Sequence, residues 1–185
     1  MTDEIKSYVG KRFTVDDVMA LGPCAEYTRE RIKKLFGRKT YLTVNDCFDL
    51  PISTEDKFWV LLRKDVLPAR LLREWAAWCA ESALKRERRR GHEPHPDSWR
   101  AVQVARRHAR GKATDEELAR AAAAAAAASD AWAAWAAWAA SAACAPAASA
   151  ASAASAASAA SAASRNSLLR KLRSMWSDYS QGENQ

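Results

Sequence analysis

Three histidines and a cysteine are the residues of this chain whose types could bind a metal ion. His92 and His95 are separated by two residues in "HEPH", a spacing found in zinc sites, and Cys79 and His108 lie on either side of them. A zinc site needs further ligands at fixed spacing, and this basic, proline-containing stretch offers no second ligand pair. We therefore expect exposed histidines, with neither a metal site nor a cofactor.

The spacing of the cysteines favours free thiols. Cys24, Cys47, Cys79 and Cys144 lie far apart in the chain, which argues against both a compact zinc site and a disulfide-rich scaffold. The first residues, "MTDEIKSYVG", are polar and acidic and do not resemble a secretory signal. The sequence thus predicts a cytoplasmic protein with reduced cysteines.

Pairs of carboxylates are the remaining candidates for catalysis, but their positions favour a structural role. The stretches "VDD" and "TEDK" supply such acids, and both lie where the first turn of a helix is expected, a location that stabilises negative charge. The sequence contains none of the common phosphate-binding, dinucleotide-binding, serine-hydrolase or zinc-protease motifs. We expect no catalytic residue, no small-molecule substrate and no enzymatic activity.

The best candidate for a binding function is a basic segment from Leu84 to Lys112. It holds ten basic residues against three acids, and this difference equals the whole net charge of +7. Such a patch can attract acidic proteins, nucleic acids or anionic lipids. We predict that the arginines of this segment form a partner-binding surface: Arg86, Arg88, Arg89, Arg90, Arg100, Arg106, Arg107 and Arg110.

An acidic protein surface is the partner that we expect for this basic segment. Opposite charge would speed the encounter between the two proteins. The segment carries no helix-turn-helix signature and no series of aromatic residues between its basic residues that could form a stacking platform, features that many nucleic-acid-binding modules use. Nucleic acid is kept as the alternative partner.

The elements that position these residues begin with short helices. Thr14 and Asp17 match a helix start. Apolar residues at helical spacing from Cys24 to Phe36 predict a second helix, which Gly37 ends.

The next stretch allows two interpretations. The run "TYLTV", from Thr40 to Val44, is the only strand-like part of the sequence, yet Thr43 and Asp46 also fit the start of a short helix. A further helix is expected to begin at Ser53.

The strongest amphipathic pattern follows Pro68 and continues to Gly91. Another helix is expected from Ser98 onward, and Thr114 with Glu117 forms a capping box for the alanine-rich helix that follows it. The apolar side of the helix between Pro68 and Gly91 is predicted to contain Leu71, Leu72, Trp75, Trp78, Cys79 and Ser82.

An alanine–serine repeat from Ser141 to Ser164 predicts a helix without a packing face. A helix turns by about 100° per residue, so a three-residue repeat moves around its axis and presents no constant side. Pro146 lacks a backbone N–H and is expected to break the helix. We therefore expect the information for folding and binding to lie before Pro146.

The fold class predicted from these patterns is all-α: a small helical domain, long alanine-rich helices broken near Pro146, and a short amphipathic C-terminal helix. We expect four regions in chain order: a helical core domain (1–112), an Ala/Trp-rich helix packed on that core (113–145), an Ala/Ser spacer (146–164), and the C-terminal helix with its tail (165–185). The packing of the second region would use three tryptophans: Trp132, Trp135 and Trp138.

An uncharged stretch from Ala131 to Ser164 is long enough to cross a bilayer. It contains no Leu, Ile, Val or Phe, and alanine and serine gain little free energy on transfer into lipid. We expect no association with a membrane.

Several short motifs occur between about Phe13 and Ala128: "LP" at Leu67-Pro68, the Cys-Ala-Glu element that starts at Cys79, Arg110-Gly111, and the cap "TDEEL" followed by alanine-rich helices. In this order they resemble a family of immunity proteins found in bacterial and phage genomes. Relatives usually place charged residues within those helices, whereas here the charges end at Asp130. The resemblance implies a helical, non-catalytic protein that protects a cell by binding and blocking a toxin.

The leading hypothesis is therefore a non-catalytic inhibitor that neutralises a toxin by direct binding, as an immunity protein or antitoxin does. A second hypothesis keeps the inhibitor but changes its target, making it a phage anti-defence protein similar to an anti-CRISPR. A third hypothesis is a basic nucleic-acid-binding protein.

Overall fold

The computed structural model describes residues 8–127 and 162–181 of the chain. The regular elements in this part are α2 (Val15–Ala20), α3 (Arg29–Phe36), α4 (Val44–Asp49), α5 (Thr54–Leu61), α6 (Ala69–Arg89), α7 (Pro96–Ala109), α8 (Asp115–Ala127) and α11 (Ala162–Gln181). An isolated bridge between Phe13 and Leu42 is the only β-type pairing within these residues. The predicted all-α fold is confirmed.

Capping side chains start the short helices, as their sequences predict. Thr14 and Thr43 each accept a hydrogen bond from the backbone N–H three residues ahead, and their own N–H groups donate to Asp17 and Asp46. These two capping boxes satisfy backbone donors that would otherwise lack partners. Of the two interpretations of Thr40–Val44, the helix start at Thr43 is the one that the structure adopts.

Two helices begin at other residues than their patterns predict. Helix α3 begins at Arg29 because Thr28 caps it, and Cys24 to Tyr27 form a turn instead. Helix α7 begins at Pro96, whose fixed backbone angle suits the first turn of a helix. His95 caps α7 by accepting a hydrogen bond from the Asp97 N–H, so the helix starts before Ser98.

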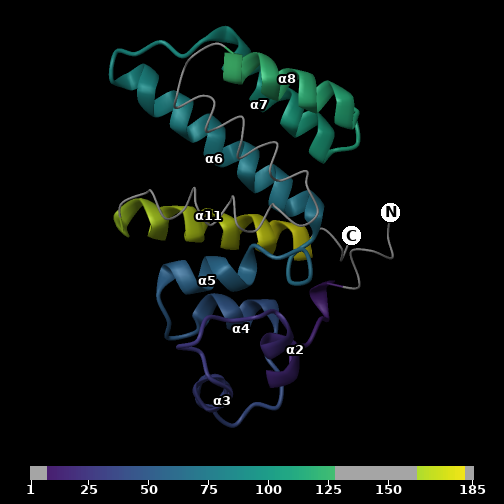
Figure 1. The fold of residues 1–185 in the computed structure, drawn as a ribbon, viewed down its shortest axis with the longest axis vertical. Helices are drawn as coiled ribbons and strands as arrows, with labels where there is room; N and C mark the ends of the chain where they lie inside the picture. Colours follow the sequence, from purple (N-terminus) through teal and green to yellow (C-terminus); the bar gives the residue numbers. More distant parts are fainter. Residues whose placement is uncertain (1–7, 128–161, 182–185) are drawn as a thin grey trace.

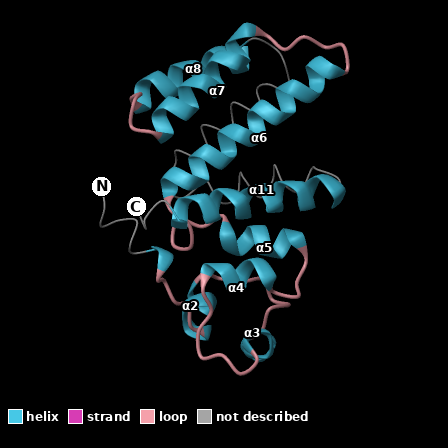
Figure 2. Cartoon of the chain, turned by 180° about the vertical axis from the view of Figure 1, so that it is seen from behind, coloured by secondary structure: helices cyan, strands magenta, loops and turns pink. Residues whose placement is uncertain are grey.

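The helices are stacked along the long axis of the molecule (Figure 1, Figure 2). At one end α7 packs on α8, and both lie over the long helix α6. Helix α11 lies between α6 and α5, although it comes last in the chain. Helices α4, α2 and α3 complete the opposite end. Helix α11 is therefore far in sequence from both helices that flank it.

Helix α6 connects the two ends of the stack because it is buried on two sides. Its first half places Leu71, Leu72 and Trp75 in the largest core cluster. Ala77 packs with Ala105 of α7, and further along α6 the small Ala80 and the larger Leu84 also face α7. The predicted apolar side of this helix is thus only one of two. Trp78 and Ser82 are half-buried.

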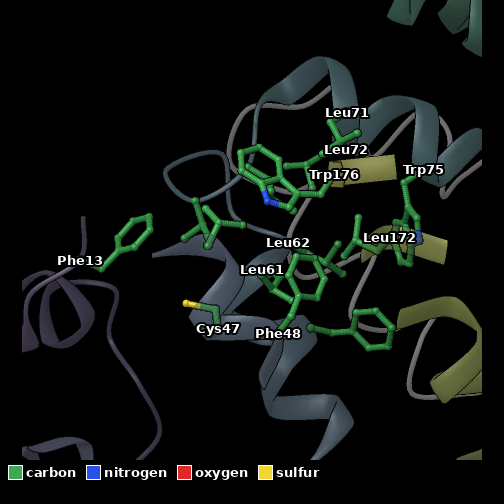
Figure 3. Close-up of a cluster of buried hydrophobic side chains, with 14 residues drawn as sticks. Phe13, Cys47, Phe48, Leu61, Leu62, Leu71, Leu72, Trp75, Leu172 and Trp176 are labelled. Carbon is green, nitrogen blue, oxygen red and sulfur yellow. The ribbon is translucent and has the colours of Figure 1, made fainter. Parts of the chain in front are cut away.

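The largest core cluster gathers side chains from α4, α5, α6 and α11. Figure 3 shows Leu172 of α11 between Leu62, which follows α5, and Trp75 of α6, while Trp176 lies on the side of Leu71 and Leu72. Leu172 is fully buried, and the Trp176 indole N–H donates to Asn45 Oδ1 at 3.0 Å. The predicted amphipathic C-terminal helix is therefore confirmed.

Helix α11 also corrects one expectation from the sequence. We expected the information for folding to lie before Pro146, but α11 supplies two residues of the main core. Arg173 forms a two-pronged ion pair with Asp49, with distances of 2.7 and 2.9 Å between nitrogen and oxygen. The expectation was wrong because the repeat carries no packing face while the residues after it do.

Several expectations concern residues that the structure does not describe. These are the break at Pro146, the Ala/Ser spacer up to residue 161, Cys144 and the packing of the three late tryptophans, whereas residues 162–164 of the predicted spacer begin α11. The division of the chain at residue 112 stays a prediction. Among the described helices, none combines the length and the apolar character needed to cross a bilayer.

Candidate partner-binding surface

All eight arginines of the predicted surface belong to the hairpin formed by α6, α7 and the residues that end these helices. The hairpin is antiparallel, since Leu84 near the end of α6 packs with Val102 of α7, and Ala77 packs with Ala105. Small side chains at these contacts allow the two helices to approach closely. The arginines consequently lie along both helices rather than in one cluster.

Three of the arginines are held by carboxylates that lie outside the basic segment. Arg106 pairs with Glu81 of α6, and Arg107 pairs with Glu117 of α8 at 2.9 Å. Arg110 lies 3.7 Å from Glu74. Counting charge along the sequence could not reveal these pairs, because their acids lie in the neighbouring helices α6 and α8.

The surroundings of Glu81, the acid beside Arg106, change its pKa. A hydrogen bond with Lys85 and the nearby charges of Arg106 and Lys85 lower the pKa of Glu81 from its ordinary value. Glu81 therefore stays ionised and neutralises part of the predicted surface. Of the three arginines, Arg106 is the least exposed at 37%, whereas Arg107 and Arg110 remain 52% and 56% exposed beside their acids.

The other five arginines lie where α6 ends and α7 begins, and we call them the arginine end: Arg86, Arg88, Arg89, Arg90 and Arg100. Arg86 and Arg89 donate only to carbonyl groups of their own helix, at Ser82 and Lys85. Neither guanidinium has a carboxylate partner among the described residues. Both side chains are exposed to solvent.

Local contacts order the remaining members of the arginine end. The Arg88 guanidinium lies 5.3 Å from the centre of the half-buried Trp99 ring. Arg90 and Arg100 pair with Glu87 and Asp97 of their own turns, at 3.0 and 4.0 Å. The two side chains nevertheless remain 67% and 74% exposed. Pairs this exposed contribute little to stability, so both arginines can also contact a partner.

The three histidines differ in their exposure to solvent. His92 and His95 are exposed, as expected, but the prediction is wrong for His108, whose side chain is only 9% exposed. His108 lies 2.7 Å from Asp115 because α8 folds back onto α7. Among the described residues, no three potential metal ligands come together.

The thiols that the structure describes are free. Cys24 is exposed, Cys47 is buried and Cys79 is half-buried. Burial raises the pKa of Cys47 to about 12, and burial also raises the pKa of Cys79. Neither of these two thiols is a reactive thiolate near neutral pH.

Sequence reasoning missed a second site, an apolar cavity between the helices at the opposite end of the stack. Its lining includes Phe13, Val18 and Tyr27. Their apolar or aromatic character indicates only that they face inward, and it carries no signal for incomplete packing. The sequence could therefore not distinguish a filled core from a cavity here.

Comparison of the chain with protein-family models, with curated proteins and with solved structures yields no match. The resemblance to immunity proteins thus stays a prediction. The arginine end must be interpreted from its own geometry and charge.

Proposed function

We propose that this protein is a non-catalytic inhibitor that binds an acidic surface of another protein through the arginine end. The observation that carries the proposal is the pair Arg86 and Arg89, which are exposed and have no carboxylate partner among the described residues. Arginine forms two-pronged hydrogen bonds with carboxylates, which makes it well suited to such a surface. The role corresponds to that of an immunity protein or antitoxin.

The composition of the arginine end supports a protein partner. Arg88 already stacks near Trp99, and arginine and tryptophan are among the residues that contribute most to protein interfaces. The rigid α6–α7 hairpin holds these side chains before a partner arrives. Binding would therefore require little reordering of the backbone.

A nucleic acid is less well served by this geometry. A protein helix that follows a phosphate backbone needs basic side chains along its length that are not neutralised by carboxylates. Arg106, Arg107 and Arg110 would extend the surface along α7, but the carboxylates of Glu81, Glu117 and Glu74 beside them offset their charge. The basic surface that remains is short, and this favours a local contact with a protein.

The test captures partners of the intact protein and measures the affinity of the identified partner for purified variants. In one variant, Arg86, Arg89 and Arg100 are each replaced by Gln, which removes three positive charges but no contact between helices. We expect the affinity to fall by about tenfold or more. We also expect the wild-type affinity to decrease as salt increases.

A matched control removes the same charge elsewhere. Lys33, Lys34 and Arg38 are exposed at the end of α3, and replacing each by Gln should leave the affinity nearly unchanged. Equal losses in both triple variants would mean that net charge alone drives binding and would contradict the proposal. A mobility shift of nucleic acid at low salt, lost only in the first variant, would replace it with the nucleic-acid hypothesis.

The kind of target is then decided by function. Co-expression with the captured toxin should restore growth if the protein acts as an immunity protein. Protection of phage DNA from a nuclease would instead identify an anti-defence inhibitor. In either case the Gln variant of the arginine end should lose the protection.

A further inference from the structure

An apolar cavity of about 340 Å³ lies where α2 and α3 meet α4 and α5. Its floor is formed by buried side chains, among them Phe13, Phe36 and Phe58. Cys24 and Glu55 at its mouth are exposed to solvent. A molecule can therefore enter from the surface and reach the apolar floor.

The cavity exists because it lies between two hydrophobic clusters. Ile32, Phe36 and Leu42 form one cluster with residues of α2, while Phe48 and Phe58 belong to the other. Helix α2 packs on α3 and α4 packs on α5, but contact between these pairs is sparse. Large side chains on short helices thus leave the space between the pairs unfilled.

Such a space is unusual for a protein interior. Cores are normally packed as densely as organic crystals, and voids that exceed a water molecule are few. Apolar cavities less than half this size stay dry and bind small hydrocarbons. The volume also lies within the range of known small-molecule sites, which combine apolar walls with a few polar groups.

The polar groups at the mouth are acceptors. Asp56 Oδ2 receives hydrogen bonds from the Tyr27 and Ser53 hydroxyl groups, both at 2.7 Å. Asp56 Oδ1 has no hydrogen-bond partner among the described residues and remains available to a donor. Glu55 adds a second carboxylate, which pairs with Arg165 of α11 at 2.7 Å.

We propose that this cavity binds a small lipophilic amine, whose hydrocarbon part fills the space above Phe58 and whose ammonium group donates to Asp56. The proposal is independent of the function assigned to the arginine end, because the two sites lie at opposite ends of the stack (Figure 1). A carboxylate at the same position would face Asp56, which pairs with no cation among the described residues, and would be repelled. An alcohol could donate a hydrogen bond but would lack the charge.

The test compares octylamine, octanol and octanoate, which share one hydrocarbon chain and differ in the polar group. Each is added below its micelle concentration to the full-length protein, and the melting temperature and the amide NMR spectrum are recorded. We expect octylamine to raise the melting temperature most and octanoate least. Amide signals of Phe13, Cys47 and Phe58 should shift, while those of α7 should not.

The net charge of the protein makes this comparison stringent. At +7, the protein as a whole attracts anions. A preference for the amine therefore reports the Asp56 carboxylate at the mouth and not the overall charge. An equal or greater effect of octanoate would overturn the assigned head group, and no signal shift at the cavity with any probe would overturn the site.

Two pairs of variants locate the effect. Val18→Phe adds volume to the cavity and should abolish the octylamine shift, whereas Val9→Phe changes an exposed residue that does not line the cavity and should not. Asp56→Asn should remove the preference for octylamine over octanol, whereas Asp65→Asn, on a residue that does not line the cavity, should keep it. Unchanged octylamine binding in Val18→Phe would contradict the proposal. The NMR measurement on the unaltered protein decides the matter if a variant does not fold.

Discussion

The two ends of the helical stack solve the packing problem differently. At the end formed by α6, α7 and α8, the buried contacts consist largely of alanines, and the helices lie close together. At the end formed by α2 to α5, large aromatic and aliphatic side chains extend from short helices and leave a cavity. Small residues on long helices give a tight fit, whereas large residues on short helices leave space that a ligand can occupy.

The largest effect is expected where α11 joins both ends of the stack. Trp176→Ala removes a buried indole and its hydrogen bond to Asn45, and it should lower the free energy of unfolding by about 3–5 kcal/mol. Urea denaturation measures this change. Ser174→Ala, an exposed position on the same helix, is the control and should change the free energy by less than about 0.5 kcal/mol.

The next largest effect is expected from larger side chains, which should change the stability of the two ends differently. Ala105→Leu inserts a larger side chain between α6, α7 and α8 and should destabilise the protein by about 1–3 kcal/mol. Val18→Phe extends into the cavity instead, and its stability should be unchanged or increased. Thermal melts of both variants test the contrast. A similar loss in both would mean that the cavity is not available space.

Removal of a helix cap should lower the free energy of unfolding by the same amount at both ends, because a cap acts within one turn. Thr43→Ala at α4 and Thr114→Ala at α8 each remove a side chain that accepts a backbone hydrogen bond. Each substitution should lower the free energy of unfolding by about 1 kcal/mol. Chemical denaturation of the two variants measures both values. If the free-energy changes of the two cap variants differ by more than those of Ala105→Leu and Val18→Phe, the two ends do not unfold together.

The smallest expected effect concerns acid stability. The pKa of Glu81 is below its ordinary value of 4.5, chiefly because of the hydrogen bond with Lys85. The unfolded chain therefore binds more protons in this range, so the stabilisation is complete above about pH 4.5 and is lost as the pH falls through the folded-state pKa. In Glu81→Gln, the loss of stability between about pH 5 and pH 3 should be smaller than in the wild type. Denaturation across this range checks the sign.

Local features of the fold could be predicted from the sequence because their causes lie within a few residues. The capping boxes at Thr14, Thr43 and Thr114 and the amphipathic pattern of the last helix are of this kind. Each of them depends on hydrogen bonds or on periodicity within one helix. The all-α fold follows from the same local signals.

The candidate surface could be predicted only in part, because its charge depends on contacts between helices. Arg86 and Arg89 are exposed, as a binding surface requires. The three arginines of α7 and its end, in contrast, lie beside acids of α6 and α8: Arg106, Arg107 and Arg110. Neither these pairs nor the cavity leaves a pattern in the sequence. The position of α11 at the centre of the stack is equally non-local.

The position of α11 has a consequence for how the protein is made. Asn45 and Trp176, which bond in the core, are separated by 131 residues, and Asp49 and Arg173 by 124. Contacts across such separations form slowly. During synthesis, the apolar faces of α5 and α6 leave the ribosome before the helix that covers them exists. Part of the apolar surface around Leu61 and Trp75 therefore stays uncovered until α11 has been made, and such transiently exposed surface favours aggregation.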